Sequence, residues 1–314
     1  MTIPITLDNF TRVETDTMIQ NMLPIIGGLG VFHHDRELAP LSQQPVIRQN
    51  RDTLYSVAVT DIAEGGATLT IPEAGDRYIS VMVINQDHYI NRVFHEAGVY
   101  ELTADEFGTE YVVVAARILF DPSDEADLAE VHRLQDALTV TAGSQGEFAY
   151  PDYDAVSYKA VRDALLVLGK TLSGLSGCFG AAGDIDPIRH LVATASAWGG
   201  LPDAEAQYIN IDPRRPRGRY TMTFGEDVPA DAFWSLSVYN GDGYFEPDAS
   251  NVTNVNSVFG TKDDDGSTTI HLGDWPRDAP NRISLPEGWN LLIRLYRPRL
   301  DELAAWSIPE IVAH

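Results

Sequence analysis

Lysine and cysteine are both scarce in this chain of 314 residues. Only three lysines occur, and 22 basic residues stand against 46 acidic ones, which gives a net charge of −24. A surface this acidic repels nucleic acid and anionic membranes, so we exclude both as default partners. The single cysteine, Cys178, excludes an intramolecular disulfide, so folding does not require an oxidising compartment.

The sequence also lacks the usual signals for export, membranes and cofactors. Its N-terminal residues have no basic region followed by an apolar stretch, and no segment reads as a membrane span. We therefore expect a cytoplasmic protein. There is no P-loop or dinucleotide-binding loop, and neither His33-His34-Asp35 nor His95-Glu96 has the spacing of a metal site. The sequence predicts neither a cofactor nor a metal.

Short runs rich in Val, Ile, Tyr and Thr, separated by turn residues, predict strands in both halves of the chain. The expected strands are 54–61, 67–71, 78–85, 99–102, 111–120, 219–224, 233–239, 267–272 and 291–296. Apolar residues at helical spacing predict helices at 16–29, 124–138, 153–172 and 187–197. The pattern predicts an α+β fold, mainly β, as an antiparallel sandwich or barrel with helical insertions.

A Gly- and Ser-rich stretch at 173–183 is the predicted linker. We therefore expect an N-terminal domain at residues 1–172 and a C-terminal domain at 184–314.

The first candidate site is the polar run Asn50-Arg51-Asp52-Thr53-Leu54-Tyr55, which opens a predicted strand. Arg51 offers a planar fork of donors that suits a carboxylate or phosphate, and Asp52 can orient it or act as a base. The competing interpretation is an internal Arg–Asp pair that fixes the entry to the strand. Asn50, Arg51 and Tyr55 are thus substrate-binding candidates, and Asp52 is a catalytic candidate.

The second candidate site is Asn85-Gln86-Asp87-His88-Tyr89, which follows the mostly apolar run at residues 79–84. Strand alternation places Asp87 and Tyr89 on one face, and Gln86 and His88 on the other. Asp87 and His88 are catalytic candidates, His88 as a general acid or base. Gln86 and Tyr89 are substrate-binding candidates. The competing interpretation is a hydrated strand end.

Longer motifs extend over nearly the whole chain. In the first half they are residues 46–55, Arg77-Tyr78-Ile79-Ser80 and residues 85–89; in the second half they are Ala197-Trp198-Gly199-Gly200, residues 233–240, Gly288-Trp289-Asn290 and residues 294–298. These motifs resemble a bacterial family whose members join two domains of unknown function. The domains are numbered twelve-fifty-four at the N-terminus and twelve-fourteen at the C-terminus.

The resemblance implies two tandem β-sandwich, jelly-roll-like domains and self-association into a homo-oligomer. It implies no reaction. The sequence departs from many relatives because it lacks an export signal. It also has Asn281-Arg282 where the resemblance leads us to expect Asn-Cys.

Together these features predict a protein that takes a small-molecule ligand in a polar pocket, with Arg51, Asp52, Asp87 and Tyr89 converging on one cavity. One hypothesis is a cofactor-independent hydrolase or isomerase acting on a small anionic or polar organic substrate. The alternative is a non-catalytic binding or scaffold protein whose ligand is, for example, a carbohydrate. A catalyst needs a group whose pKa is near the working pH, and a binding protein does not.

The net charge of −24 predicts that salt stabilises this protein. Self-repulsion weakens the folded state at low ionic strength, and added salt screens it. The melting temperature should therefore rise from low salt to about 1 M NaCl, where the Debye length is about 3 Å. A flat or falling melting temperature would contradict this argument.

Overall fold

The fold is described from a computed structural model that covers residues 2–44, 46–143, 146–248 and 250–314. In this described part the strands form several sheets, none of them closed, and helices lie in both halves of the chain. The expected α+β fold, mainly β, is confirmed. No helix of the described residues is long and apolar enough to cross a membrane.

All the predicted helices and strands form, and further short strands join them. The helices are α1 (Phe10–Ile26), α2 (Ala104–Phe107), α3 (Glu125–Ala137), α4 (Ala155–Gly169), α5 (Pro187–Ala197) and α6 (Leu300–Leu303). The strands are β1 (His33–His34), β2 (Thr53–Asp61), β3 (Ala67–Ile71), β4 (Ile79–Asn85), β5 (Ile90–Phe94), β6 (Gly98–Leu102), β7 (Tyr111–Leu119), β8 (Thr139–Ala142), β9 (Ala206–Ile211), β10 (Arg219–Phe224), β11 (Ala230–Tyr239), β12 (Asn254–Asn256), β13 (Thr268–Gly273), β14 (Arg282–Ile283), β15 (Asn290–Pro298) and β16 (Val312–Ala313). The largest difference from prediction is at α1, which begins at Phe10 rather than at Asp16.

Contacts divide the chain into two compact units, and the division differs from the predicted one. The first unit runs up to Arg36 and continues over Leu54–Asp203, and the second consists of Glu37–Thr53 and Ala204–His314. Helix α5 belongs to the first unit because it packs against α1 and α4. The predicted linker also packs into this unit, since Cys178 and Phe179 are buried. The boundaries of independently folding domains stay a prediction.

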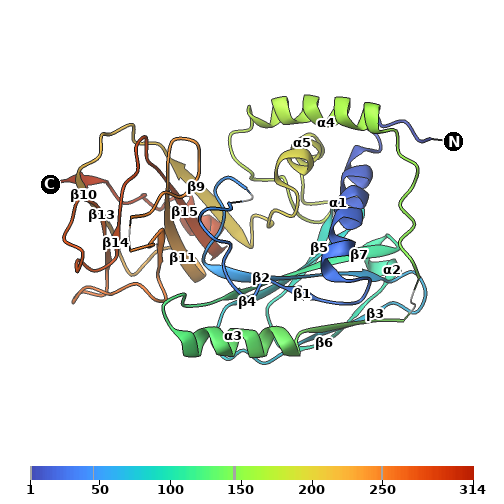
Figure 1. The fold of residues 1–314 in the computed structure, drawn as a ribbon, viewed down its shortest axis with the longest axis horizontal. Helices are drawn as coiled ribbons and strands as arrows, with labels where there is room; N and C mark the ends of the chain where they lie inside the picture. The colour runs from blue at the N-terminus through green and yellow to red at the C-terminus, as the bar shows by residue number, and fades with distance from the viewer. Residues whose placement is uncertain (1, 45, 144–145, 249) are drawn as a thin grey trace. The chain divides into compact units, whose positions relative to one another are not determined.

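The first unit contains a five-stranded sheet in the order β1-β2-β7-β4-β5 and a three-stranded sheet in the order β6-β3-β8. Every residue of β4 is buried, as its mostly apolar sequence predicts. Helices α1, α4 and α5 lie together beside the larger sheet (Figure 1). They share a small apolar core around Phe10, Leu165 and Val192. This arrangement brings α1 to the end of β4, where the second polar run begins.

The second unit is a β-sandwich of two four-stranded sheets. Their orders are β14-β13-β10-β16 and β12-β11-β15-β9. Alternate side chains from both sheets form one core, in which the rings of Phe224 and Trp234 stack with centroids 4.0 Å apart. The sandwich expected for this part of the chain is present, and its jelly-roll topology stays a prediction.

The segment Glu37–Thr53 is an integral part of the second unit, although it precedes most of the first unit in sequence. The Gln44 amide exchanges two hydrogen bonds with the backbone of Phe245, at 2.8 and 3.0 Å. The Tyr239 hydroxyl donates to the carbonyl of Gln49 at 2.9 Å. The first predicted site run therefore begins inside the second unit.

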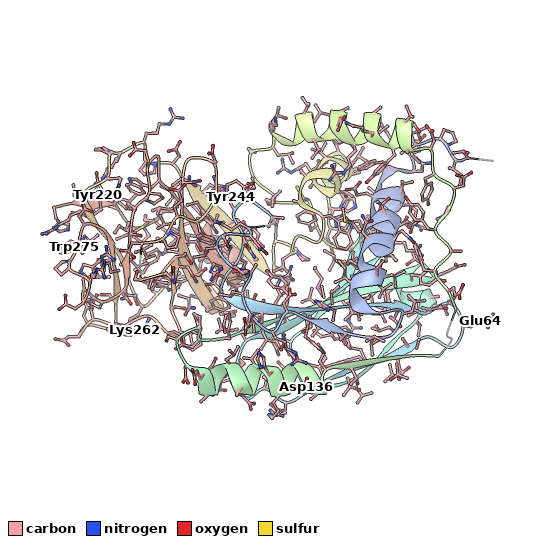
Figure 2. The ribbon with its side chains drawn as sticks, in the orientation of Figure 1. Glu64, Asp136, Tyr220, Tyr244, Lys262 and Trp275 are labelled. Carbon is pink, nitrogen blue, oxygen red and sulfur yellow. The ribbon has the colours of Figure 1, made fainter. Side chains whose placement is uncertain are left out.

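Gly273, the last residue of β13, lies at a point of close backbone approach in this sandwich. It has φ +91°, and a Cβ there would lie 1.8 Å from the carbonyl oxygen of Gly218. Tyr220 and Trp275 lie nearby, joined by an indole N–H bond to the Tyr220 carbonyl (Figure 2). We expect Gly273→Ala to lower the free energy of unfolding by at least about 2 kcal/mol in urea denaturation.

Gly183 provides the matched control, because a Cβ there meets nothing within 4 Å and its φ is not positive. Gly183→Ala should leave the free energy of unfolding within about 0.5 kcal/mol of wild type. Equal effects of the two substitutions would show that the close approach at Gly273 is not a constraint on the fold.

Candidate functional site

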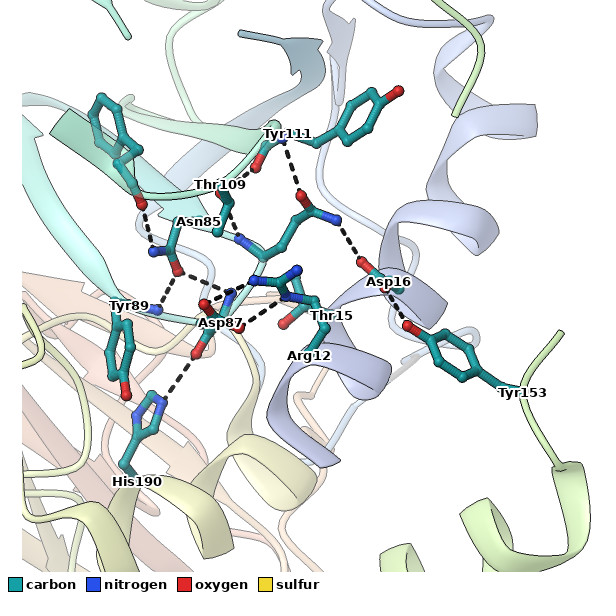
Figure 3. Close-up of polar contacts among 12 residues, drawn as sticks. Arg12, Thr15, Asp16, Asn85, Asp87, Tyr89, Thr109, Tyr111, Tyr153 and His190 are labelled. Carbon is teal, nitrogen blue, oxygen red and sulfur yellow. Dashed lines mark hydrogen bonds and ion pairs between the residues drawn. The ribbon is translucent and has the colours of Figure 1, made fainter. Parts of the chain in front are cut away.

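The polar run after β4 is a tight turn between β4 and β5, and the Asn85 side chain holds it. Its Oδ1 accepts hydrogen bonds from the backbone N–H groups of Asp87 and Tyr89, at 3.0 and 2.8 Å. Its Nδ2 donates to the carbonyl of Phe107 at 2.7 Å (Figure 3). His88 has φ +64°. The expected alternation of side chains between two faces over residues 86–89 is therefore wrong. The hydrogen bonds of the Asn85 side chain turn the chain directly after Asn85, so the strand does not continue into these residues.

Asp87 pairs with Arg12 of α1. The guanidinium donates from Nε and Nη2 to the two carboxylate oxygens, each at 2.8 Å. Both side chains keep 37% of their surface exposed, so the pair contributes at most about 1 kcal/mol to stability. The main effect of the pair is to fix the positions of the two side chains, because the two-point contact holds the guanidinium and the carboxylate in one geometry beside α1.

Asp16 lies inside α1 and is only 3% exposed. Its two carboxylate oxygens accept hydrogen bonds from Gln86 Nε2 at 2.8 Å and from the Tyr153 hydroxyl at 2.7 Å. Burial raises the pKa of the Asp16 carboxyl, while these hydrogen bonds and the charge of Arg12 oppose the shift. The Gln86 amide oxygen in turn accepts from the backbone N–H of Tyr111 at 3.1 Å. Three separate segments are thus joined through one buried carboxylate.

A pocket of about 450 Å³ lies against these groups in the first unit. Its walls combine polar side chains with aromatic rings. They are formed by Arg12, Asp16, Gln86, Gly108, Thr109, Glu110, Tyr111, Phe148, Ala149, Pro151 and Tyr153. Of the residues predicted from the sequence, Gln86 lines the pocket and Asp87 supports its wall through Arg12.

His88 and Tyr89 pack against α5 instead of lining this pocket. His88 is fully buried, and its ring stacks with those of His190 and Trp198, with centroid distances of 5.2 and 5.4 Å. Its Nε2 accepts from the N–H of Gly199 at 2.9 Å, and its Nδ1 contacts the Thr194 hydroxyl at 2.8 Å. The Tyr89 ring stacks on that of His190 at 5.2 Å.

These contacts fix the protonation state of His88. Since Nε2 accepts from an amide, Nδ1 carries the proton of the neutral ring and donates it to Thr194. Burial, with a smaller effect of His190, holds the pKa of His88 well below its usual 6.5. Proton transfer by His88 would first require one of these two hydrogen bonds to break.

The first polar run has a different setting, in the second unit. Asp52 is 1% exposed and accepts hydrogen bonds from the Ser235 hydroxyl at 2.5 Å and from Asn254 Nδ2 at 2.7 Å. Burial raises the pKa of the Asp52 carboxyl, and the charge of Arg294 opposes the shift. Arg51 donates to the carbonyl of Ala39 at 2.9 Å.

The remaining predicted binding residues of this run divide between the two units. Asn50 donates to the Thr53 hydroxyl at 3.0 Å within the second unit. Tyr55 belongs to the first unit, where its ring lies 5.3 Å from the guanidinium carbon of Arg117. Because Arg51 and Asp52 belong to the second unit and Asp87 and Tyr89 to the first, their convergence on one cavity stays a prediction.

Sequence reasoning missed Arg12, Asp16, Tyr111 and Tyr153. One signal for Asp16 was present: it follows Val13 and precedes Ile19 at helical spacing, so a carboxylate falls on the buried stripe of α1. A buried acid on an apolar stripe requires partners, which makes it a candidate for function. In the described part of the chain, no group of three or more His, Cys, Asp or Glu residues is placed to hold a metal ion.

Comparison with known proteins supports the resemblance found in the motifs. Residues 29–98 match the model of a protein family of unknown function, DUF1254, and residues 205–300 match that of a second such family, DUF1214. The chain therefore carries both domains of the pair that the motifs predict, in the predicted order. No curated protein matches its sequence.

Solved structures support the fold alone. The VPA0106 protein from Vibrio parahaemolyticus superposes with a TM-score of 0.76 at 16% identity, covering 98% of this chain and 97% of that one. A putative uncharacterized protein from Burkholderia cenocepacia gives a TM-score of 0.51 at 12% identity, covering 98% and 87%. At these identities the similarity carries no information on chemistry.

Because the His88 ring is buried and hydrogen-bonded, we expect it to stay neutral, in its Nδ1–H form, when the pH falls just below 6.5, the usual pKa of a histidine. The unfolded chain binds a proton at that position below pH 6.5, so His88 makes the fold less stable as the pH falls below 6.5. Its contribution is up to about 1.4 kcal/mol per pH unit. Imidazole ¹⁵N chemical shifts should show the tautomer, and urea titrations of His88→Gln should show a smaller loss of stability in acid.

His33→Gln is the control, because the His33 side chain is 39% exposed and its replacement should leave the tautomer and the chemical shifts of the His88 ring unchanged. A His88 ring that titrates near pH 6.5 would show that its two hydrogen bonds are not maintained in solution.

Proposed function

We infer that the first unit binds a small polar organic molecule in the pocket beside Asp16. The pocket itself carries this proposal: about 450 Å³ lies within the range of about 300–1,000 Å³ that is usual for small-molecule sites. It combines aromatic walls with a few fixed polar groups, which is the composition of such sites.

The polar groups of the pocket are ordered before any ligand arrives. Gln86 is held by Asp16 and by the N–H of Tyr111, and Arg12 is held by Asp87. Side chains that are already fixed lose little conformational entropy when a ligand binds. More of the interaction free energy of each contact therefore contributes to affinity.

The aromatic rings give the pocket apolar surface. The rings of Tyr111 and Phe148 meet edge to face at 5.1 Å, and Tyr153 meets Tyr150 in the same way at 5.4 Å. Of these rings, Tyr111, Phe148 and Tyr153 line the pocket, and their contacts with one another or with Tyr150 set their positions.

Catalysis by proton transfer is a second candidate, and Asp16 is the observation that favours it. A carboxyl whose pKa is raised by burial, and which contacts a tyrosine hydroxyl, suits a general acid or base. Hydrolysis or isomerisation without a cofactor would use it. The catalytic roles first expected for Asp52, Asp87 and His88 remain predictions, as do a cytoplasmic location and self-association.

Filling the pocket should abolish binding. Ala149 lines the pocket, and Ala149→Trp would place an indole there. We expect small polar compounds that raise the melting temperature of wild type in a thermal-shift screen to have no effect on this variant, because a ligand stabilises only a fold that binds it.

Ala160→Trp, on the exposed side of α4, is the matched control and should retain every response. Compounds that stabilise Ala149→Trp as well as wild type do not use this pocket, and that result would remove the proposal. If a compound binds and is recovered chemically unchanged after incubation with the protein, the protein is a binding protein. If wild type converts the compound to a product and Asp16→Asn does not, the protein is an enzyme that uses Asp16.

A further inference from the structure

We propose that the pocket beside Asp16 recognises an organic cation, a small molecule that carries an ammonium group. The inference rests on the proposed function, because it names the class of ligand for the same pocket. It departs from the anionic substrate that the Arg51 motif favours.

The charges that line the pocket do not balance. Among its described lining residues, Arg12 is the one basic side chain, and Asp16 and Glu110 are acidic. Arg12 already directs Nε and Nη2 to both oxygens of Asp87, a carboxylate that lies just outside the lining. The pocket with its immediate surroundings therefore carries more negative than positive charge.

The two tyrosines of the pocket respond to this field. Burial raises the pKa of the Tyr111 hydroxyl, and the charges of Asp61 and Glu110 raise it further. Burial also raises the pKa of Tyr153, together with its hydrogen bond to Asp16. Burial is the larger cause for both hydroxyls, and the neighbouring carboxylates shift each pKa in the same direction, as expected where negative charge is undercompensated.

The aromatic walls complete the match. Tyr111, Phe148 and Tyr153 all line the pocket, and the face of an aromatic ring attracts a cation through its quadrupole. An ammonium group there would have aromatic rings around it and the carboxylate of Asp16 within the same pocket. Aromatic rings are the groups that protein sites use for quaternary ammonium ligands, and a carboxylate adds the attraction of opposite charges.

Other ligand classes fit less well. An anion would meet Asp16 and Glu110, while the fork of Arg12 that could bind it is already bonded to Asp87. A neutral polyol could take hydrogen bonds from Gln86 and Tyr153 but would leave the charge of Asp16 as undercompensated as before. A cation alone gains from both the carboxylates and the rings.

Choline and its uncharged isostere 3,3-dimethylbutan-1-ol separate charge from shape. Isothermal titration at constant ionic strength, with NaCl as the balancing salt, should show choline binding at least about tenfold more tightly than the isostere. Acetate should not bind. Phe148→Leu keeps an apolar side chain but removes the aromatic face, and it should weaken choline binding several-fold.

Two controls address the general attraction of cations to a chain of net charge −24. Phe259→Leu changes an exposed phenylalanine in the second unit and should leave choline binding unchanged. Ala149→Trp should abolish it. If choline raises the melting temperature of Ala149→Trp as much as that of wild type, it acts by screening charge, and that outcome would overturn the inference.

The remaining outcomes distinguish the ligand class from the pocket itself. If choline binds no better than the isostere, or neither binds, the assignment of an ammonium ligand is wrong. Should other compounds then bind wild type and not Ala149→Trp, the proposed pocket function stands without it. If no compound distinguishes wild type from Ala149→Trp, both proposals fail together.

Discussion

The need to satisfy the buried carboxylate of Asp16 joins three segments of the first unit. Asp16 is 3% exposed within α1, and a buried acid is tolerated only when its oxygens are hydrogen-bonded. Its partners, Gln86 and Tyr153, come from the β4–β5 turn and from the segment before α4. Helix, turn and segment therefore meet at one point, and the pocket lies against that point. The position of the pocket is thus a consequence of where the charge is buried.

Local patterns predicted the elements, because those patterns act over a few residues. Helix α5 has its predicted bounds since Asp186 caps it and Pro187 suits its first turn. The turn at 86–89 was not predictable from alternation, because it depends on the Asn85 side chain bonding backbone groups of the same turn and of Phe107. Two of the five residues in that run, Gln86 and Asp87, contribute to the pocket site. Arg12 and Tyr153 carry no local signal, and only tertiary structure brings them there.

Asp52 and Asp16 show how similar carboxylates acquire different settings. Both are buried, and burial raises the pKa of each. Asp52 is enclosed by Ser235 and Asn254 within the second unit, so a ligand that reached it there would have to displace one of these hydrogen bonds. Asp16 also has two partners, but it lines a pocket. Access, more than pKa, separates the two as candidates for chemistry.

A single turn also divides its side chains between the pocket and the packing against α5. Gln86 faces the pocket and Asp87 fixes Arg12 at its wall. At His88 the backbone takes φ +64°, and the side chains that follow pack against α5, where His88 and Tyr89 both stack on His190. The hydrogen bonds of His88 with Thr194 and Gly199 then anchor the turn on the side that faces α5. The neutral histidine thus holds in place the turn that carries Gln86 and Asp87, and Asp16 rather than His88 is the buried ionisable group that lines the pocket.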